Sequence, residues 1–391
     1  MKLKQQPEDF QVEELTDLVP AEQGPFAFYR LEKRGWSTPD ALQAIRRRWQ
    51  LDLRRLSYGG LKDKHAHTVQ YLTIFHGPQR RLTHHGVSLE YLGQVAEPYT
   101  SQHIRANRFR ITLRALTAGE LTFAQQALEE VRGEGVPNYF DDQRFGSVAR
   151  QGGDFVARAL VLGRYEEALR LALTAPYEFD RAPQKREKEV LLAHWGDWAV
   201  LKDKLPRGHA RSLVDYLAHH PDDFRGAVAR LRPDLRGLYL SAFQSYLWNQ
   251  MLALWLRQHC RPEQLLTVNL RLGEAPMHRA LDEEPRAELS QLRLPLPSAR
   301  LHLDPADPGM ILMQTILDQE SLKVEQLKLK GLREMFFSKG DRAALCLPSG
   351  LTHEAGLDEK HPGRHQLVLA FELPRGAYAT LVVKRIFGIG H

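Results

Sequence analysis

The uneven distribution of strand-like and helical patterns along the chain is the feature that most constrains its fold. Runs that alternate apolar and polar residues occupy the chain up to residue 116 and return from residue 343. Helical spacing dominates between residues 154 and 257. One sheet whose strands are separated by a long helical stretch indicates an α/β sheet domain that is interrupted by an inserted domain.

Local patterns place the individual elements. The predicted strands are 10–15, 26–31, 66–75, 87–95, 107–116, 343–347 and 366–373, and the predicted helices are 38–49, 120–132, 154–174, 212–231 and 238–257. Ser37 or Thr38 can cap the helix that Pro39 opens. The segment 180–189 reads as a charged connection, and the prolines between 262 and 308 predict short strands and loops there.

Basic residues are concentrated in two places. The net charge of +6 is modest, but residues 42–64 carry seven basic side chains against two acids, and residues 101–114 carry four arginines and no acid. In the strand 107–116, alternation places Phe109, Ile111 and Leu113 on the buried face and Arg108, Arg110 and Arg114 on the solvent face. Such clusters favour binding of a phosphate backbone. A solvated basic face without a partner explains the charge equally well.

Several function classes lack sequence support. The chain has no phosphate-binding loop, dinucleotide fingerprint, zincin motif or hydrolase elbow. Its His pairs lack further ligands, and Cys260 and Cys346 form no zinc spacing. No apolar run is long enough to span a membrane. We therefore expect a cytoplasmic protein without a metal, a nucleotide cofactor or a membrane anchor.

Three short stretches are richer in functional residue types than ordinary connections. In 57–66, Asp63 lies between Lys62 and Lys64 after a Gly-Gly turn, where positive charge favours an ionised carboxylate, although a charged turn tip is the alternative. In 135–146, aromatic residues interleave with Asn138, Gln143 and Arg144, as in a base pocket or a turn with buried aromatics. The stretch 240–250 has helical spacing and reads as a packed helix.

Five segments in order resemble motifs of the TruD family of tRNA pseudouridine synthases. They are PEDFQVEE at 7–14, GLKDKHA at 60–66, VPNYFDDQRFG at 136–146, LYLSAFQSYLWNQ at 238–250 and LPRGAYATLVVKRI at 373–386. The chain departs from the family at Asp141, where a glycine usually follows Asn-Tyr-Phe. Asp is among the residues that best tolerate a backbone suited to glycine, so the departure leaves the resemblance intact.

The resemblance implies an α+β fold. A pseudouridine synthase core, with a mixed and mainly antiparallel sheet flanked by helices, is interrupted by a family-specific inserted TRUD α/β domain. On this chain the implied parts are 1–160 and 346–391 for the core and 161–345 for the insert. The resemblance also implies that a uridine of tRNA, at position 13 in the best-known bacterial members, is isomerised without cofactor or metal. We expect a monomer whose partner is tRNA.

The family's functional residues can be transferred only where a motif matches. Asp63 matches the catalytic aspartate, and Lys4, which lies six residues before Phe10, would pair with it. Phe10, Asn138 and Tyr378 match positions that contact the target nucleotide, with Tyr378 in place of a common Phe. Phe140 would stack near the flipped base. Candidate phosphate contacts are Arg46, Arg47, Arg48, Arg108, Arg110 and Arg144.

These residue types suit the implied chemistry. Aromatic rings can replace the stacking that a base loses when it leaves the helix, and a carboxylate can attack the sugar or the pyrimidine ring. Two alternatives remain. A non-catalytic RNA-binding protein on the same fold would make GLKDKHA an ordinary loop, and a two-carboxylate glycosidase would need a partner for Asp63 that no motif supplies.

Overall fold

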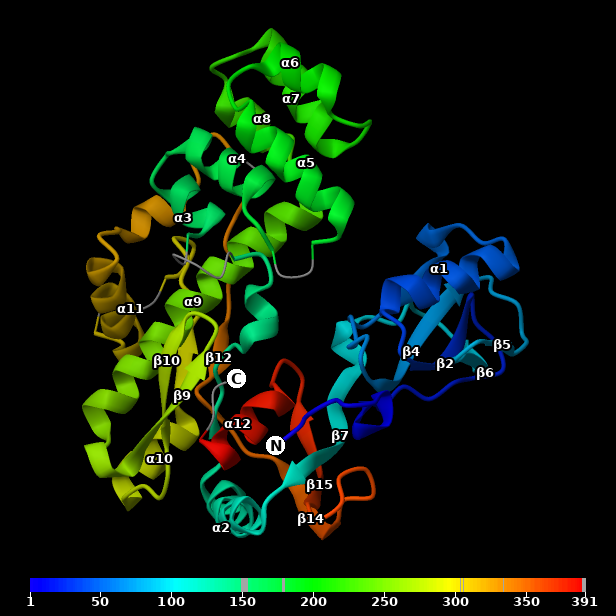
Figure 1. The fold of residues 1–391 in the computed structure, drawn as a ribbon, viewed down its shortest axis with the longest axis vertical. Coiled ribbons are helices and arrows are strands. Elements are labelled where there is room, and N and C mark those ends of the chain that lie inside the picture. Colours follow the sequence, from blue (N-terminus) through cyan, green and yellow to red (C-terminus); the bar gives the residue numbers. More distant parts are fainter. Residues whose placement is uncertain (149–153, 178–179, 303, 305, 333, 389–391) are drawn as a thin grey trace. The chain divides into compact units, whose positions relative to one another are not determined.

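The chain folds into two compact units (Figure 1). The computed structural model describes residues 1–148, 154–177, 180–302, 304, 306–332 and 334–388. The first unit contains Met1–Val136 and Cys346–Phe387, and the second contains Pro137–Leu345 and Gly388. Two short strands, β8 (Val136–Pro137) and β13 (Leu345–Cys346), pair where the chain passes from one unit to the other. The assignment of 161–345 to a TRUD domain stays a prediction.

A nine-stranded sheet forms the centre of the first unit. Its order is β14-β15-β7-β1-β4-β2-β6-β5, with β3 beside β4. Only β1 and β4 run parallel among these pairs, so the predicted mixed and mainly antiparallel sheet is confirmed. The strands are β1 (Phe10–Thr16), β2 (Phe26–Arg34), β3 (Leu56–Tyr58), β4 (His67–Phe75), β5 (Leu82–His84), β6 (Val87–Val95), β7 (Ile104–Leu116), β14 (Ser349–Leu357) and β15 (His365–Pro374).

Strand β7 follows the predicted alternation except at its end. Phe109, Ile111 and Leu113 are buried, whereas Arg108 and Arg110 are exposed. The prediction that Arg114 faces solvent is wrong, because its guanidinium is buried between two carboxylates from distant parts of the chain. A charged side chain can be buried when ion pairs and hydrogen bonds replace its hydration.

Three helices accompany this sheet: α1 (Thr38–Trp49), α2 (Ala118–Glu134) and α12 (Ala379–Phe387). The Ser37 hydroxyl accepts a hydrogen bond from the backbone amide of Asp40, so Ser37, one of the two candidate caps, is the residue that caps α1. Leu42 and Ile45 pack this helix into a core cluster with residues of β2, β4 and β6. Helix α2 packs against α12, β7 and β15, and ends at Gly135 with φ +72°, a backbone conformation that favours glycine.

The second unit is built mainly from helices around the long α9 (Pro233–His259), against which α3, α11, β10 and β11 pack (Figure 1). Its other helices are α3 (Val156–Val161), α4 (Tyr165–Thr174), α5 (Ala182–Ala193), α6 (Trp198–Lys204), α7 (His209–His219), α8 (Phe224–Ala229), α10 (Glu283–Gln291) and α11 (Pro308–Gln319). It also contains two antiparallel strand pairs: β9 (Leu265–Leu270) with β10 (Gly273–His278), which follow each other in the chain, and β11 (Arg293–Pro295) with β12 (Asp341–Ala343), which are separated by α11.

Helix boundaries in the second unit differ from the prediction in several places. The predicted helix 154–174 is two helices, because Gly163 has φ +73° between α3 and α4. The predicted helix 212–231 is α7 and α8, separated around Pro221. The expected connection 180–189 forms most of α5, and the proline-rich stretch contains α10, which tolerates Pro285 in its first turn. No helix within the described ranges is long and apolar enough to cross a membrane.

Candidate active site

The loop between β3 and β4 presents Asp63 at the surface of the first unit. The Asp63 side chain is 28% exposed, and its Oδ2 forms an ion pair with Nζ of Lys4, whose side chain is 19% exposed. The two residues are far apart in sequence, so this pair depends on the folded sheet. It gives the carboxylate a fixed cationic neighbour while leaving part of it accessible to a ligand.

Three fully buried polar side chains hold the backbone of this loop. Nζ of Lys33 donates hydrogen bonds to the carbonyl oxygens of Trp36 at 2.7 Å, Asp63 at 2.8 Å and Lys62 at 3.3 Å. The Thr38 hydroxyl accepts from the Lys62 amide at 2.9 Å, and Gln70 donates to the Gly60 carbonyl at 3.2 Å. These side chains come from β2, α1 and β4, so the position of the Asp63 backbone is set by the sheet itself.

Lys33 combines complete burial with three acceptors. Burial is the main cause that lowers its pKa to about 8, the Lys62 charge lowers it further and the Asp63 charge opposes both. At neutral pH the ammonium is still mostly protonated and can donate three hydrogen bonds. The sequence gives no signal for Lys33, which lies in no motif and beyond the predicted strand 26–31, although β2 extends to Arg34.

The two lysines beside Asp63 have different surroundings. Nζ of Lys62 lies 2.9 Å from Oε1 of the buried Glu14 and donates to Oδ1 of Asn107 at 2.9 Å. Lys64 is exposed. The Lys62 ammonium is thus bound by Glu14 and Asn107, and the ion pair of Asp63 is made with Lys4. That the charge of the flanking lysines keeps Asp63 ionised stays a prediction.

Phe10 lies beneath Lys4 rather than in the open. Nζ of Lys4 is 4.1 Å from the centre of the Phe10 ring, which is a cation–π distance. The ring is only 4% exposed and meets Phe109 edge-on at 6.2 Å. In this structure Phe10 supports the lysine that pairs with Asp63, and little of its ring surface is available to a base.

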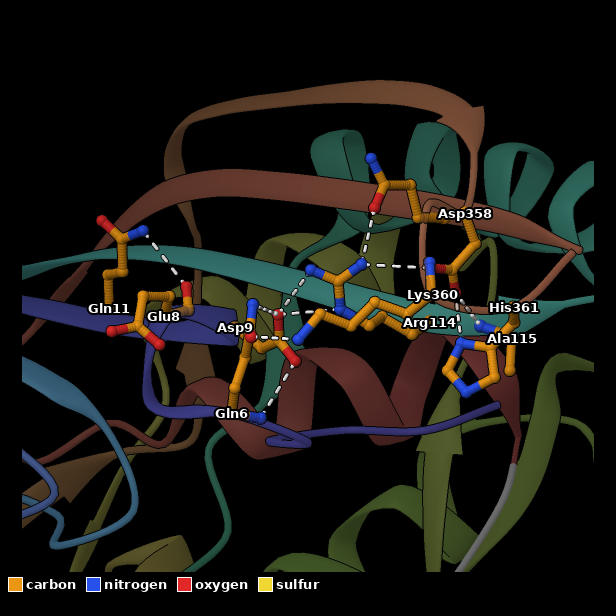
Figure 2. A network of polar contacts seen from close by, with 10 residues as sticks. Gln6, Glu8, Asp9, Gln11, Arg114, Ala115, Asp358, Lys360 and His361 are labelled. Carbon is orange, nitrogen blue, oxygen red and sulfur yellow. Dashed lines mark hydrogen bonds and ion pairs between the residues drawn. The ribbon is translucent and has the colours of Figure 1, made fainter.

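A buried polar network anchors the segment that carries Lys4 (Figure 2). Arg114 forms ion pairs with Asp9 at 2.8 Å and with Asp358 at 3.1 Å. Burial acts to raise the pKa of Asp358, but amides of Ala115 and Lys360, together with charged neighbours, hold it well below its ordinary value. Asp9 lies directly before β1. Its ion pair with Arg114 therefore connects the N-terminal segment to β7, and the ion pair of Arg114 with Asp358 connects both to the turn between β14 and β15.

In the second motif loop, 135–146, the ring of Phe140 is buried inside the protein. Phe140 belongs to the second unit and is 6% exposed. The guanidinium of Arg342 lies 4.2 Å from its ring centre, that of Arg144 lies 5.1 Å away, and Trp248 of α9 meets it edge-on at 5.5 Å. Cations and an aromatic edge therefore already cover this ring.

Asn138 is also engaged within the second unit. Its side-chain amide donates to the Ala343 carbonyl at 3.0 Å, and its Oδ1 accepts from Arg342 at 2.7 Å. Asn249 of α9 exchanges hydrogen bonds of 2.8 Å with the backbone of Phe140. The stretch 240–250 is thus a packed helix, as predicted. Arg342 binds both predicted pocket residues, and it lies in no motif that could have revealed it.

The remaining predicted residues have different surroundings. Tyr378 is partly buried directly before α12 in the first unit. Arg47 and Arg48 are exposed on α1, whereas Arg46 is partly buried. The exposed arginines of β7 are ion-paired, Arg108 with Glu372 at 2.7 Å and Arg110 with Glu354 at 3.4 Å. Nε of Arg144 donates to Ser245 at 3.1 Å.

The structure therefore brings together Lys4, Phe10 and Asp63 in the first unit. Asn138, Phe140 and Arg144 form another cluster, which lies within the second unit.

Chemically, the first of these clusters offers one accessible carboxylate with a cationic partner on a rigid loop. Such a group can act as a nucleophile or can move a proton at a bound ligand. Across the described residues, no group of three or more His, Cys, Asp and Glu side chains could hold a metal ion. Cys260 and Cys346 are buried free thiols, and burial is the main cause that raises the pKa of Cys260 to about 11, which makes it a poor nucleophile.

Comparisons with known proteins match almost the whole chain. A family model described as tRNA pseudouridine synthase D (TruD) matches residues 1–386. The chain is 29% identical to "Probable tRNA pseudouridine synthase D 1" of Methanococcus maripaludis, with 100% of both chains covered. It is 30% identical to "Probable tRNA pseudouridine synthase D 2" of Methanocaldococcus jannaschii, covering 99% of this chain and 92% of the relative. A crystal structure described as "Putative tRNA pseudouridine synthase D (TruD)" from Methanosarcina mazei superposes with a TM-score of 0.72 at 26% identity, covering 100% of this chain and 94% of that one.

Proposed function

We propose that this chain, which belongs to the TruD family of tRNA pseudouridine synthases, converts uridine 13 of tRNA into pseudouridine with Asp63 as the nucleophile. Membership of the family makes the chain an isomerase that acts on tRNA. The observation that carries the finer proposal is the partly exposed carboxylate of Asp63, paired with Lys4 on a loop whose backbone is held by buried side chains.

The proposed reaction needs a carboxylate more than any other group. Asp63 attacks either the sugar or the pyrimidine ring of a uridine that has left its stack. The bond between the sugar carbon and the ring nitrogen breaks, and a bond from the same sugar carbon to a ring carbon replaces it. The bond that Asp63 formed then breaks, and its electron pair returns to the carboxylate. The ring carbon loses one proton and the ring nitrogen gains one, so atoms and electrons balance without a cofactor.

Lys4 has a definite task in this scheme. Its ammonium fixes the direction of the Asp63 carboxylate, and Phe10 and the anchored N-terminal segment hold the lysine in place. A nucleophile that is already oriented loses little freedom when the substrate arrives, which lowers the barrier to attack. The ion pair has to loosen as the covalent bond forms, because the attacking oxygen gives up its negative charge.

The deciding experiment replaces Asp63 by Asn. Asp63→Asn keeps the shape but supplies an amide that cannot attack carbon, so pseudouridine formation on unmodified tRNA should fall below detection. Binding of tRNA should stay within about threefold, because phosphate contacts and base stacking come from other residues. Nearest-neighbour mapping of the product should place the modification at position 13.

Asp17→Asn is the matched control, since Asp17 is an exposed aspartate of the same unit. It should turn over like the unchanged chain. A folded Asp63→Asn chain that still forms pseudouridine would refute the nucleophile. A chain that binds tRNA but forms no pseudouridine even with Asp63 present would favour the non-catalytic RNA-binding alternative, and release of free base would favour a glycosidase.

A further inference from the structure

A basic groove in the second unit has no part in the site described above. It has a volume of about 630 Å³ and is lined from the segments 299–302, 327–332, 335–337 and 339. Its floor is apolar and buried, formed by side chains such as Leu329, Leu332 and Phe337. We call it the Phe336 groove, after the exposed ring in its lining.

The cations of the Phe336 groove have no acidic partner among the described residues. Lys328, Lys330 and Lys339 are exposed, and none of them is ion-paired within the described part of the chain. The described lining contains no acidic residue. Glu334, the acid nearest to the ring in sequence, binds Arg236 at 3.0 Å instead. By contrast, the exposed arginines of β7 already have carboxylate partners, so the groove is the more attractive surface for an anion.

The aromatic side of the groove is equally distinctive. Phe336 is 56% exposed, although burying a phenyl ring removes apolar surface from water and stabilises a protein. The guanidinium of Arg300 lies over the ring at 4.7 Å from its centre. Phe336 also lines a neighbouring groove of about 330 Å³. There the Nε of the buried Arg236 has no hydrogen-bond partner among the described residues. An unsatisfied buried donor of this kind is costly unless a ligand or water completes it.

We propose that the Phe336 groove binds a nucleotide of the tRNA substrate, with the base against Phe336 and Arg300 and the neighbouring phosphates against the lysines. The inference rests on the proposed function only in taking tRNA as the substrate. An exposed ring beside unpaired lysines is the combination that binds single-stranded nucleic acid, because bases stack on the ring and phosphates follow the cations. The described lining offers no carboxylate for chemistry, so the groove binds and does not react.

The test measures the affinity of the full-length chain for unmodified tRNA. Phe336→Ala should raise the dissociation constant between about fivefold and a hundredfold, the range expected when one base loses its aromatic partner. Phe336→Tyr keeps the ring and should bind like the unchanged chain. Phe123→Ala removes a similarly exposed ring from α2 and is the matched control, with no expected change.

The charged side of the groove has its own measurement. Replacing Lys328 and Lys330 together by Gln should reduce the slope of log affinity against log salt by about 1.5, because each phosphate contact on nucleic acid contributes ~0.7–0.9. Ultraviolet cross-linking of bound tRNA should mark the peptide that contains Phe336, and the cross-link should disappear in Phe336→Ala. Circular dichroism of each variant should match that of the unchanged chain, since all of these side chains are exposed.

The outcomes separate this inference from the proposed function. Phe336→Ala should weaken tRNA binding, whereas Phe123→Ala should leave both tRNA affinity and turnover unchanged. Phe336→Ala with unchanged affinity and unchanged cross-linking would overturn the groove even if the chain makes pseudouridine. Weakened binding in Phe336→Ala would support the groove even if no pseudouridine forms. If Phe336→Ala loses affinity for polyglutamate but not for tRNA, the groove binds an acidic protein partner, and the proposal is overturned.

Discussion

The two motif loops of this protein differ in whether their functional side chains are exposed or make contacts inside the protein. In the loop between β3 and β4, buried side chains hold the backbone and the Asp63 carboxylate is left partly exposed. In the loop 135–146, the side chains themselves are engaged, with Phe140 between Arg342 and Arg144 and Asn138 hydrogen-bonded to Arg342. A sequence motif can therefore mark a presented group or an internal contact, and the residue types alone do not separate the two.

The difference has an energetic consequence. Removing a presented group costs little stability, because the group makes few contacts that folding depends on. Removing an internal contact leaves a cavity and unsatisfied partners, both of which destabilise the folded state. Stability and activity measured on the same variants can therefore test the comparison.

The largest expected effect on stability belongs to Phe140. Phe140→Ala removes a buried ring with its aromatic and cation–π contacts, and should lower the free energy of unfolding of the second unit by about 3–5 kcal/mol. Chemical denaturation followed by tryptophan fluorescence suits the measurement, since Trp248 contacts the ring. Asp63→Asn should change the stability by less than about 1 kcal/mol. If Phe140→Ala unfolds like the unchanged chain but loses tRNA affinity, Phe140 presents its ring to the base as the family resemblance implies.

The next effect concerns the support beneath Asp63. Lys33→Met removes the donor to three carbonyl oxygens and should lower turnover by roughly tenfold to a hundredfold, because a displaced nucleophile attacks poorly. Lys64→Met makes the same change at an exposed lysine in the loop that carries Asp63, and should have little effect on turnover. Equal losses in both variants would show that charge near Asp63, rather than the buried donor, is what matters.

The pH dependence of stability provides a second readout for Lys33. Its pKa is lowered from 10.5 to about 8 in the folded protein, so between these values the unfolded chain binds more protons than the folded chain. Stability contributed by this residue must then rise with pH. From pH 7 to pH 9.5 the unchanged chain should gain about 2 kcal/mol relative to Lys33→Met. A difference that stays flat across this range would contradict the burial of a protonated lysine.

The smallest effect contrasts two pairs of surface arginines. Arg47 and Arg48 on α1 have no carboxylate partner in the described part of the chain, whereas Arg108 and Arg110 on β7 are ion-paired. Replacing the first pair by Gln should reduce the salt dependence of tRNA binding by at most about two slope units. Replacing the second pair should change it less. A larger effect from the β7 pair would move the tRNA footprint to that strand.

Several residues that hold the two clusters in place could not be predicted from the sequence. Asp63 and Lys4 could be named because they lie in or near motifs, and the structure places them in contact. Lys33 and Arg342 gave no signal, because a lysine in a strand and an arginine near a turn are usually solvated. Their roles depend on which backbone oxygens the folded chain brings to them. The catalytic and nucleotide-binding roles of the predicted residues stay predictions.

The sequence by itself determined the local features of this protein. Alternation placed Phe109, Ile111 and Leu113 on the buried face of β7, and Pro39 with Ser37 or Thr38 before it marked the start of α1. Each of these depends on neighbours within a few residues. Tertiary structure alone decided that Arg114 is buried, since its partners Asp9 and Asp358 come from opposite ends of the chain. It also decided that Phe140 is covered by Arg342 while Asp63 stays partly exposed, because burial depends on which distant segments pack together and not on local pattern.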